Sequence, residues 1–137
     1  MDILRLYIEQ LLTEVGAINR ANIKHDLSGE QETVTLTPTN GDACEVCVWR
    51  DHAADTSVVE VGGVPVEFYG SVDAVRDIVL AVIEGTLLLE TRIRGGRTAA
   101  IRVTWPRADG TQYSLVHNVS LRFWGQAETV PKRCGAY

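Results

Sequence analysis

The sequence predicts an α+β fold in which two amphipathic helices lie on one face of a mainly antiparallel sheet of about six or seven strands. Three observations lead to this prediction. Apolar residues recur at helical spacing in two segments, 2–19 and 71–84. Between and after these segments apolar and polar residues alternate, as they do in half-buried strands. The expected order, α-β-β-β-β-α-β-β-β, places too many strands in direct succession for a parallel βαβ arrangement.

The length and composition of the chain predict a single domain over residues 1–137. A chain of 137 residues can bury a core without metal or disulfide support. It has no apolar run near the roughly 20 residues that span a bilayer, and its first ten residues lack a basic signal-peptide region. Three cysteines, an odd number, argue against a secreted disulfide framework. We therefore expect a cytoplasmic protein with no membrane partner and no cofactor.

The first helix is predicted by a continuous apolar stripe. Its members recur every three or four residues along segment 2–19: Leu4, Tyr7, Ile8, Leu11, Leu12, Val15 and Ile18. Leu6 is an exception, because it is apolar but lies on the polar side. The polar stretch from His25 to Glu32 contains a Ser-Gly pair and is expected to be a loop.

The next strands are predicted as two hairpins. Val34 and Leu36 alternate with threonines, and residues 38–42 have the composition of a turn before a second strand at 43–50. Segments 58–61 and 64–69 flank Gly62-Gly63, and paired glycines supply the positive φ that a two-residue hairpin requires. Pro65 should place its strand at a sheet edge or near the strand start.

The second helix is expected to begin at the capping residue Ser71 and to end at Gly85. Nearly all of its residues are apolar, so we expect it to be substantially buried. Three strands should follow, at 87–94, 99–105 and 112–124, and pair as a meander. Residues 125–137 are treated as a possible C-terminal tail.

Only the segment Cys44-Glu45-Val46-Cys47 looks like a chemical motif. With His52 it matches three positions of a zinc-knuckle spacing, but Ser57 stands at the fourth. Residues three apart on a strand point to opposite faces, which disfavours a shared metal, and no helix start is present to activate a redox thiol. We therefore interpret both cysteines as small buried hydrophobes, with no metal site, and Cys134 as an incidental free thiol.

The histidines offer one candidate pocket. His117 shares a strand face with large apolar residues, so it is either a core histidine or one wall of a pocket lined by Trp105 and Tyr113. The core interpretation is favoured. His25 and His52 fall in expected loops, where solvated side chains are the simpler interpretation, and nothing in the sequence pairs them.

Four arginines of the C-terminal meander form a second candidate site. Arg92, Arg94, Arg102 and Arg122 should project from the same side of the sheet, and Trp124 lies on the face of Arg122. Arginine and tryptophan are typical of protein-interaction hot spots and of grooves for anions or single-stranded nucleic acid. Four solvated arginines on an exposed face are an equally open interpretation.

Charge is distributed unequally along the chain. Residues 1–85 contain five Lys or Arg and fifteen Asp or Glu, whereas residues 86–137 contain eight and three. The two halves can simply attract each other, or one of them can face a partner. The overall charge of −5 makes general nucleic-acid binding an unfavourable interpretation.

The sequence favours a small, acidic, non-enzymatic protein that binds another protein, through an exposed sheet face or the acidic N-terminal half. It lacks the common nucleotide, metalloprotease, serine-hydrolase and deaminase motifs. Bacterial immunity proteins and small secretion chaperones share its size and charge, an analogy of class only. The alternatives are a small-molecule binder or enzyme with a pocket between the second helix and the sheet near His117, and an anion or nucleic-acid site on the arginines. Homodimerisation is compatible with each.

Overall fold

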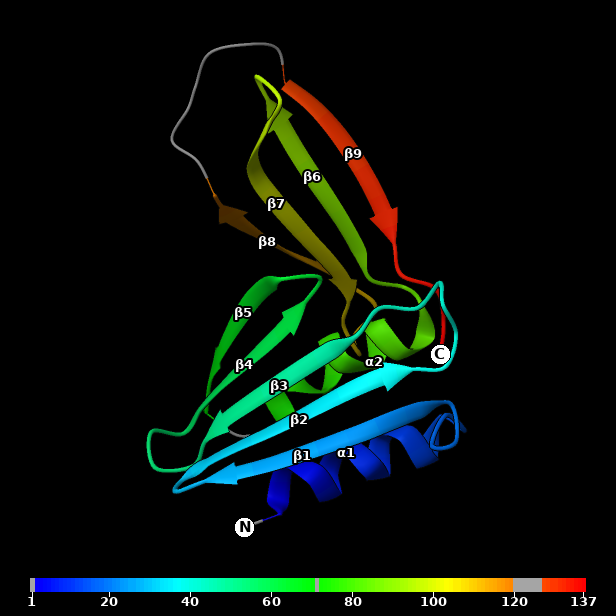
Figure 1. Cartoon of the computed structure of the whole chain (residues 1–137), viewed down its shortest axis with the longest axis vertical. Coiled ribbons are helices and arrows are strands. Elements are labelled where there is room, and N and C mark those ends of the chain that lie inside the picture. The colour runs from blue at the N-terminus through cyan, green and yellow to red at the C-terminus, as the bar shows by residue number, and fades with distance from the viewer. Residues whose placement is uncertain (1, 71, 120–126) are drawn as a thin grey trace.

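A computed structural model describes residues 2–70, 72–119 and 127–137 (Figure 1). In these residues the chain forms two α-helices, one short 3-10 helix and nine strands. Their order and bounds are α1 (Ile3–Glu14), β1 (Ala21–Ser28), β2 (Gln31–Pro38), β3 (Val46–Asp51), β4 (Thr56–Val61), β5 (Val64–Tyr69), η1 (Val72–Val75), α2 (Arg76–Glu84), β6 (Leu88–Arg94), β7 (Arg97–Pro106), β8 (Gln112–Asn118) and β9 (Ala127–Arg133).

The strands form two antiparallel sheets. The first has the order β1-β2-β3-β4-β5 and the second β8-β7-β6-β9. Both helices lie on the same side of the five-stranded sheet, and the four-stranded sheet extends away from its β3–β5 end (Figure 1). The mixed, mainly antiparallel architecture is confirmed. The prediction of one sheet with six or seven strands is wrong, because two segments expected to be irregular are strands and the C-terminal meander forms a sheet of its own.

Helix α1 follows the predicted apolar stripe but is shorter than expected. Leu4, Ile8, Leu11 and Leu12 are buried against the sheet. The helix ends at Glu14 because Gly16 takes a left-handed φ of 72°, which turns the chain toward β1. Neither helix of the described residues is long and apolar enough to cross a membrane.

The expected loop from His25 to Glu32 is instead the turn of a β-hairpin. His25 pairs with Val34 and Ser28 with Gln31, so β1 continues to the two-residue turn at Gly29 and Glu30. The polar character of this segment hid the strand, since two of its inward-facing side chains are His25 and Glu32 rather than apolar residues. Figure 1 shows the hairpin at the edge of the sheet, beneath which α1 runs.

The second predicted hairpin is confirmed. Gly62 and Gly63 have φ values of 58° and 81° and connect β4 to β5. Pro65 is the second residue of β5, and β5 is an edge strand, so its missing N–H does not interrupt a ladder bond inside the sheet.

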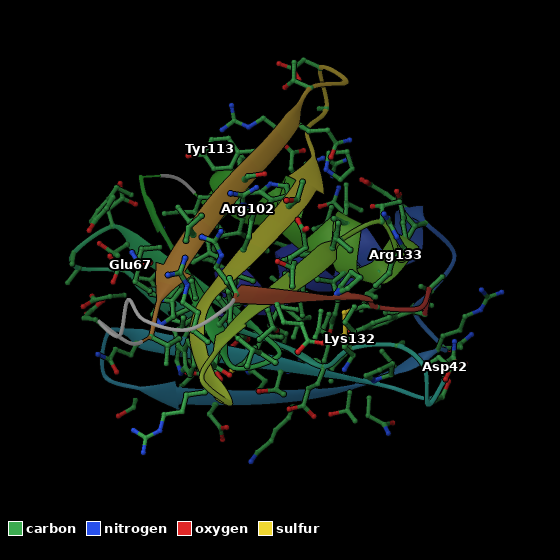
Figure 2. All side chains as sticks on the ribbon, turned by 90° about the horizontal axis from the view of Figure 1, so that it is seen from above. Asp42, Glu67, Arg102, Tyr113, Lys132 and Arg133 are labelled. Atoms are coloured by element: carbon green, nitrogen blue, oxygen red, sulfur yellow. A yellow bond between two sulfur atoms is a disulfide. The ribbon has the colours of Figure 1, made fainter. Side chains whose placement is uncertain are left out.

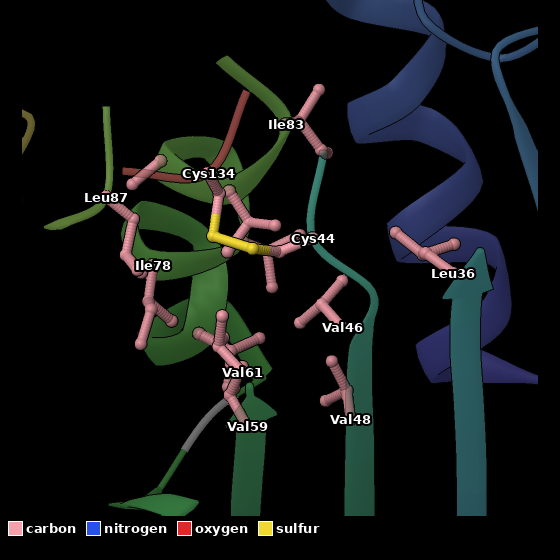
Figure 3. Packing of buried hydrophobic residues seen from close by; sticks show 14 of the residues in the cluster. Leu36, Cys44, Val46, Val48, Val59, Val61, Ile78, Ile83, Leu87 and Cys134 are labelled. Atoms are coloured by element: carbon pink, nitrogen blue, oxygen red, sulfur yellow. A yellow bond between two sulfur atoms is a disulfide. The ribbon is translucent and has the colours of Figure 1, made fainter. Parts of the chain in front are cut away.

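Helix α2 lies between the two sheets and joins their cores. Its buried residues, including Ile78, belong to one hydrophobic cluster with the inner valines of β3 and β4 (Figure 3). The same cluster continues into Val103 and Trp105 of β7. The helix ends at Gly85, which is left-handed with a φ of 73°. Ser71, the predicted cap, lies outside the described residues.

The C-terminal residues form a strand rather than a tail. Ala127–Arg133 pairs with β6 along its whole length, from Arg94 opposite Ala127 to Leu88 opposite Arg133. All seven residues of β9 are exposed, so no apolar alternation marks it in the sequence. The predicted long strand 112–124 is described only to Asn118 as β8, and Arg122 and Trp124 lie outside the described residues.

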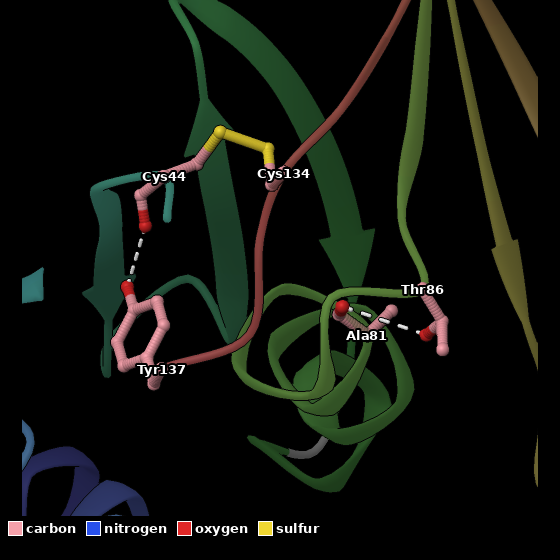
Figure 4. Close-up of a disulfide and its surroundings, with 5 residues drawn as sticks. All are labelled: Cys44, Ala81, Thr86, Cys134 and Tyr137. Carbon is pink, nitrogen blue, oxygen red and sulfur yellow. Dashed lines mark hydrogen bonds between the residues drawn. A yellow bond between two sulfur atoms is a disulfide. The ribbon is translucent and has the colours of Figure 1, made fainter. Parts of the chain in front are cut away.

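A disulfide attaches the end of the chain to the first sheet. Cys44 is bonded to Cys134, with 5.3 Å between the two Cα atoms (Figure 4). The Tyr137 hydroxyl donates a 2.7 Å hydrogen bond to the carbonyl of Cys44, and its ring is buried. The interpretations of Cys44 as a packing residue and Cys134 as a free thiol are therefore wrong; Cys47 is the one free thiol among the described residues.

Candidate protein-binding face

The structure brings together two of the predicted arginines. Arg92 on β6 and Arg102 on β7 line one hollow on the free face of the four-stranded sheet. Arg94 lies two residues beyond Arg92 on the same strand face. Figure 2 labels Arg102 on this sheet and Glu67 on β5 of the five-stranded sheet.

The residues predicted to form a pocket belong to the junction between the sheets. Trp105 is buried, with its ring edge-on to Phe68 at 6.4 Å between centroids and tilted toward Tyr113 at 5.0 Å. The guanidinium of Arg107 lies 4.3 Å above the Tyr113 ring. His117 is half-buried on β8, opposite Ile101. These three predicted residues do not line the hollow that holds Arg92 and Arg102.

The face of the five-stranded sheet that points away from the helices, here the outer face, is not covered by any other element of residues 2–70, 72–119 and 127–137. Burial alternates along β2, β3 and β4, with Val34, Val48 and Val59 on the helix side. The residues between them, including Trp49 and Val58, therefore point outward. Figure 1 shows this face toward the viewer, with α1 and α2 behind it.

An aromatic patch lies on the outer face. The strand register places Trp49 opposite Val58, and Tyr69 opposite Thr56, which is two residues before Val58 on β4. Trp49 is 38% exposed and Tyr69 76% exposed. Trp49 and Val58 line an open hollow of about 550 Å³ together with residues of the β3–β4 turn. We refer to Trp49, Val58 and Tyr69 as the outer-face patch.

Besides the cation Lys24, which is opposite Thr35, the outer face carries several carboxylates. The electrostatic field of three of these carboxylates, Glu60, Glu45 and Asp26, acts on the Cys47 thiol, which lies on the same face. Burial is the largest influence that raises the pKa of this thiol, and the three carboxylates raise it further, although a hydrogen bond from Thr35 opposes them. A thiol held protonated in this way is a poor nucleophile.

The combination of patch and charge is suited to binding a basic protein segment. Tryptophan and tyrosine contribute most of the binding energy at many interfaces, because they bury a large area at low entropic cost. An arginine or lysine of the partner can stack on the Trp49 ring, an interaction worth about 0.5–2 kcal/mol. The nearby carboxylates would pair with further cations and guide the encounter.

The most polar buried cluster of the described residues is centred on Glu32. Its side chain is fully buried, and each oxygen accepts two hydrogen bonds. Oε1 is 2.9 Å from the Leu4 backbone nitrogen and 2.9 Å from His52 Nε2, while Oε2 is 3.0 Å from the Arg5 nitrogen and 2.7 Å from His25 Nε2. His25 and His52 are thus paired through one carboxylate, and the interpretation of both as solvated loop residues is wrong.

We assign the Glu32 cluster a structural role. Asp2 makes no capping bond at the start of α1, and Glu32 takes over that function from β2. Asp2, His25 and Glu32 offer atoms within 4.8 Å of one another, an arrangement that could accommodate a cation. However, a metal there would compete with the 2.7 Å bond between the imidazole and the carboxylate and with the backbone N–H groups that Glu32 satisfies.

The sequence did not reveal the outer face because Trp49 is its main marker, and Trp49 lies in a predicted strand, 43–50, whose residues are mostly apolar on both faces. Trp49 follows Val46, Cys47 and Val48, so the segment resembles a central strand.

Comparisons with protein-family models, with curated proteins and with solved structures found no match to this chain.

Proposed function

We propose that this protein is a non-enzymatic binding protein that recognises a basic segment of another protein through the outer face of its five-stranded sheet. The observation that carries the proposal is the exposed Trp49 beside Val58 and Tyr69, with carboxylates on the same face. Tryptophan and tyrosine are enriched at protein interfaces relative to the rest of the protein surface. The class analogy with immunity proteins and secretion chaperones agrees with this role.

The proposal is tested by affinity capture from the native host with Trp49→Ala. We expect wild-type protein to retain a partner rich in Lys and Arg, and the variant to lose it, since removal of a hot-spot tryptophan costs at least about 2 kcal/mol, or roughly 30-fold in affinity. Leu6→Ala is the matched control, because Leu6 is an exposed apolar residue on α1, away from the outer face. Equal capture by wild type and Trp49→Ala would contradict the proposal.

The electrostatic part of the proposal has a separate test. Replacement of Asp26, Glu45 and Glu60 by their amides should slow association and reduce its dependence on salt. The control neutralises three carboxylates elsewhere, at the exposed residues Glu30, Glu84 and Glu128, and so changes the net charge equally. If both triple variants behave alike, the partner responds to total charge and not to the outer face.

A second copy of the chain is the alternative occupant of the outer face. It would make the protein a homodimer, and light scattering on the purified protein distinguishes the two occupants. The cytoplasmic location expected from the sequence rested partly on the absence of a disulfide framework, and the Cys44–Cys134 bond removes that support, because disulfides form mainly in oxidising compartments. Alkylation of thiols in freshly lysed native cells tests the location, because one free thiol indicates an oxidising compartment and three indicate a reducing one.

A further inference from the structure

The four-stranded sheet carries a hollow that the proposed function does not use. It has a volume of about 190 Å³ and receives residues from all four strands, namely Glu90, Arg92, Ala100, Arg102, Val116 and Thr129. We refer to it as the arginine hollow. It lies on a different sheet from Trp49, so its occupancy and that of the outer face can be tested separately.

The register brings the two arginines of this hollow close together. Arg92 is opposite Ala100 on β7, and Arg102 is opposite Glu90 on β6. The arginines are therefore diagonal cross-strand neighbours, a relation in which the backbones are about 7–8 Å apart and long side chains meet. The short Ala100 side chain beside Arg92 leaves the space between the two guanidinium groups open.

Neither guanidinium is neutralised within the described part of the chain. Arg92 and Arg102 form no ion pair or hydrogen bond there, and Glu90 does not reach Arg102 although the two are directly opposite. Each guanidinium presents a planar fork of N–H donors that matches the two oxygens of a carboxylate. Thr129 on β9, opposite Arg92, adds a hydroxyl donor.

The size and lining of the hollow indicate the kind of anion. Its volume is below the roughly 300 Å³ at which clefts accept drug-sized ligands, so it suits one small group. Val116, which is 46% exposed, and Ala100 add apolar surface beside the guanidinium groups. We propose that the arginine hollow binds a carboxylate on a short aliphatic stem, either the glutamate side chain of an acidic protein segment or a free dicarboxylic acid.

Three probes separate these sources and test the chemistry. Glutarate, a tetraglutamate peptide with blocked termini, and inorganic phosphate are titrated into the full-length protein, with amide chemical shifts and calorimetry as readouts. We expect carboxylate probes to shift Ala100 and Val116. Arg92→Gln and Arg102→Gln should each weaken binding by at least about tenfold, the usual cost of a charge-assisted pair. Arg102→Lys should also weaken it, since lysine keeps the charge but loses the fork.

The control is Arg97→Gln, which removes the same charge from the exposed first residue of β7. It should leave binding within about twofold of the wild type, because surface charges of this kind contribute little. Binding of the peptide alone identifies a protein segment as the source, and binding of glutarate identifies a free acid as sufficient. Equal losses in Arg97→Gln, preference for phosphate, or no binding of either carboxylate probe would overturn the proposal.

Discussion

The carboxylate of Glu32 accepts a 2.9 Å hydrogen bond from the backbone nitrogen of Leu4, 28 residues earlier in the chain. A residue of β2 thereby caps helix α1 and joins it to the sheet. The imidazoles of His25 and His52 also bond to this carboxylate, one at each oxygen. Helix position and sheet edge are consequently coupled through one buried group.

Glu32→Gln should lower the free energy of unfolding by about 3 kcal/mol or more, because an amide presents N–H groups to donors that need an acceptor. Urea denaturation measures this change. Glu30→Gln is the matched control, since Glu30 is exposed in the adjoining turn and its replacement should stay within about 0.5 kcal/mol. Similar effects of the two substitutions would contradict the capping role.

Acid should remove the contribution of the Glu32 carboxylate to the free energy of unfolding. Burial alone would raise the pKa of this carboxyl, but hydrogen bonds from Leu4, Arg5 and the two histidines outweigh it and hold the pKa below the ordinary value of 4.5. A group whose pKa is lower in the folded state stabilises the protein above its unfolded-state pKa, and this stabilisation is lost as pH falls through the folded value.

The measurement is urea denaturation between pH 5 and pH 3 on wild type and Glu32→Gln. The difference in stability between the two proteins should shrink toward pH 3. A difference that stays constant over this interval would mean that the carboxyl has the same pKa in the folded and unfolded states.

Reduction of the disulfide should destabilise the protein strongly. Cys44 and Cys134 are 90 residues apart, and closing a loop of this size stabilises a fold by about 4–5 kcal/mol in the chain-entropy account. Urea midpoints with and without dithiothreitol measure the effect. Cys47→Ala should preserve the response to reductant because its thiol is free, whereas Cys134→Ala should abolish it. An unchanged midpoint on reduction of the wild type would count against the bond.

Gly85→Ala should be more damaging than Gly110→Ala. Both glycines have positive φ, 73° and 85°, so each alanine is strained by about 1 kcal/mol. A Cβ at Gly85 would also lie 2.6 Å from the backbone nitrogen of Ala136, whereas nothing lies within 4 Å at Gly110. The crowding should add about 1–3 kcal/mol. Thermal unfolding of the two variants compares them, and equal losses would argue against docking of the C-terminus on α2.

Several elements could be predicted from the sequence because a local signal, either a periodicity or a glycine, defines each. The stripe of α1, the glycine pair between β4 and β5, and the glycine stop of α2 are all local signals of this kind. Strand β1 escaped prediction because its inward residue His25 is polar, and its partner Glu32 lies on the next strand. Strand β9 escaped because it is exposed along its whole length and has no apolar period.

The candidate faces depend on pairings over long sequence separations, which periodicity does not encode. The proximity of Arg92 and Arg102 could be predicted because their strands are neighbours in sequence and in space. The outer-face patch required the order of β3, β4 and β5 and the side on which the helices lie. The Cys44–Cys134 bond joins residues that only the completed fold brings together, so spacing alone could not reveal it.

The central claim, that a partner binds over Trp49, is tested most directly at the Trp49 ring itself. Protein labelled with 5-fluorotryptophan contains three tryptophans, and the fluorine resonance of Trp49 is assigned with Trp49→Phe. On addition of the captured partner, the Trp49 resonance should shift or broaden, while that of Trp105, buried at the junction of the sheets, should not. A complex that forms while the Trp49 resonance stays unchanged would contradict the claim.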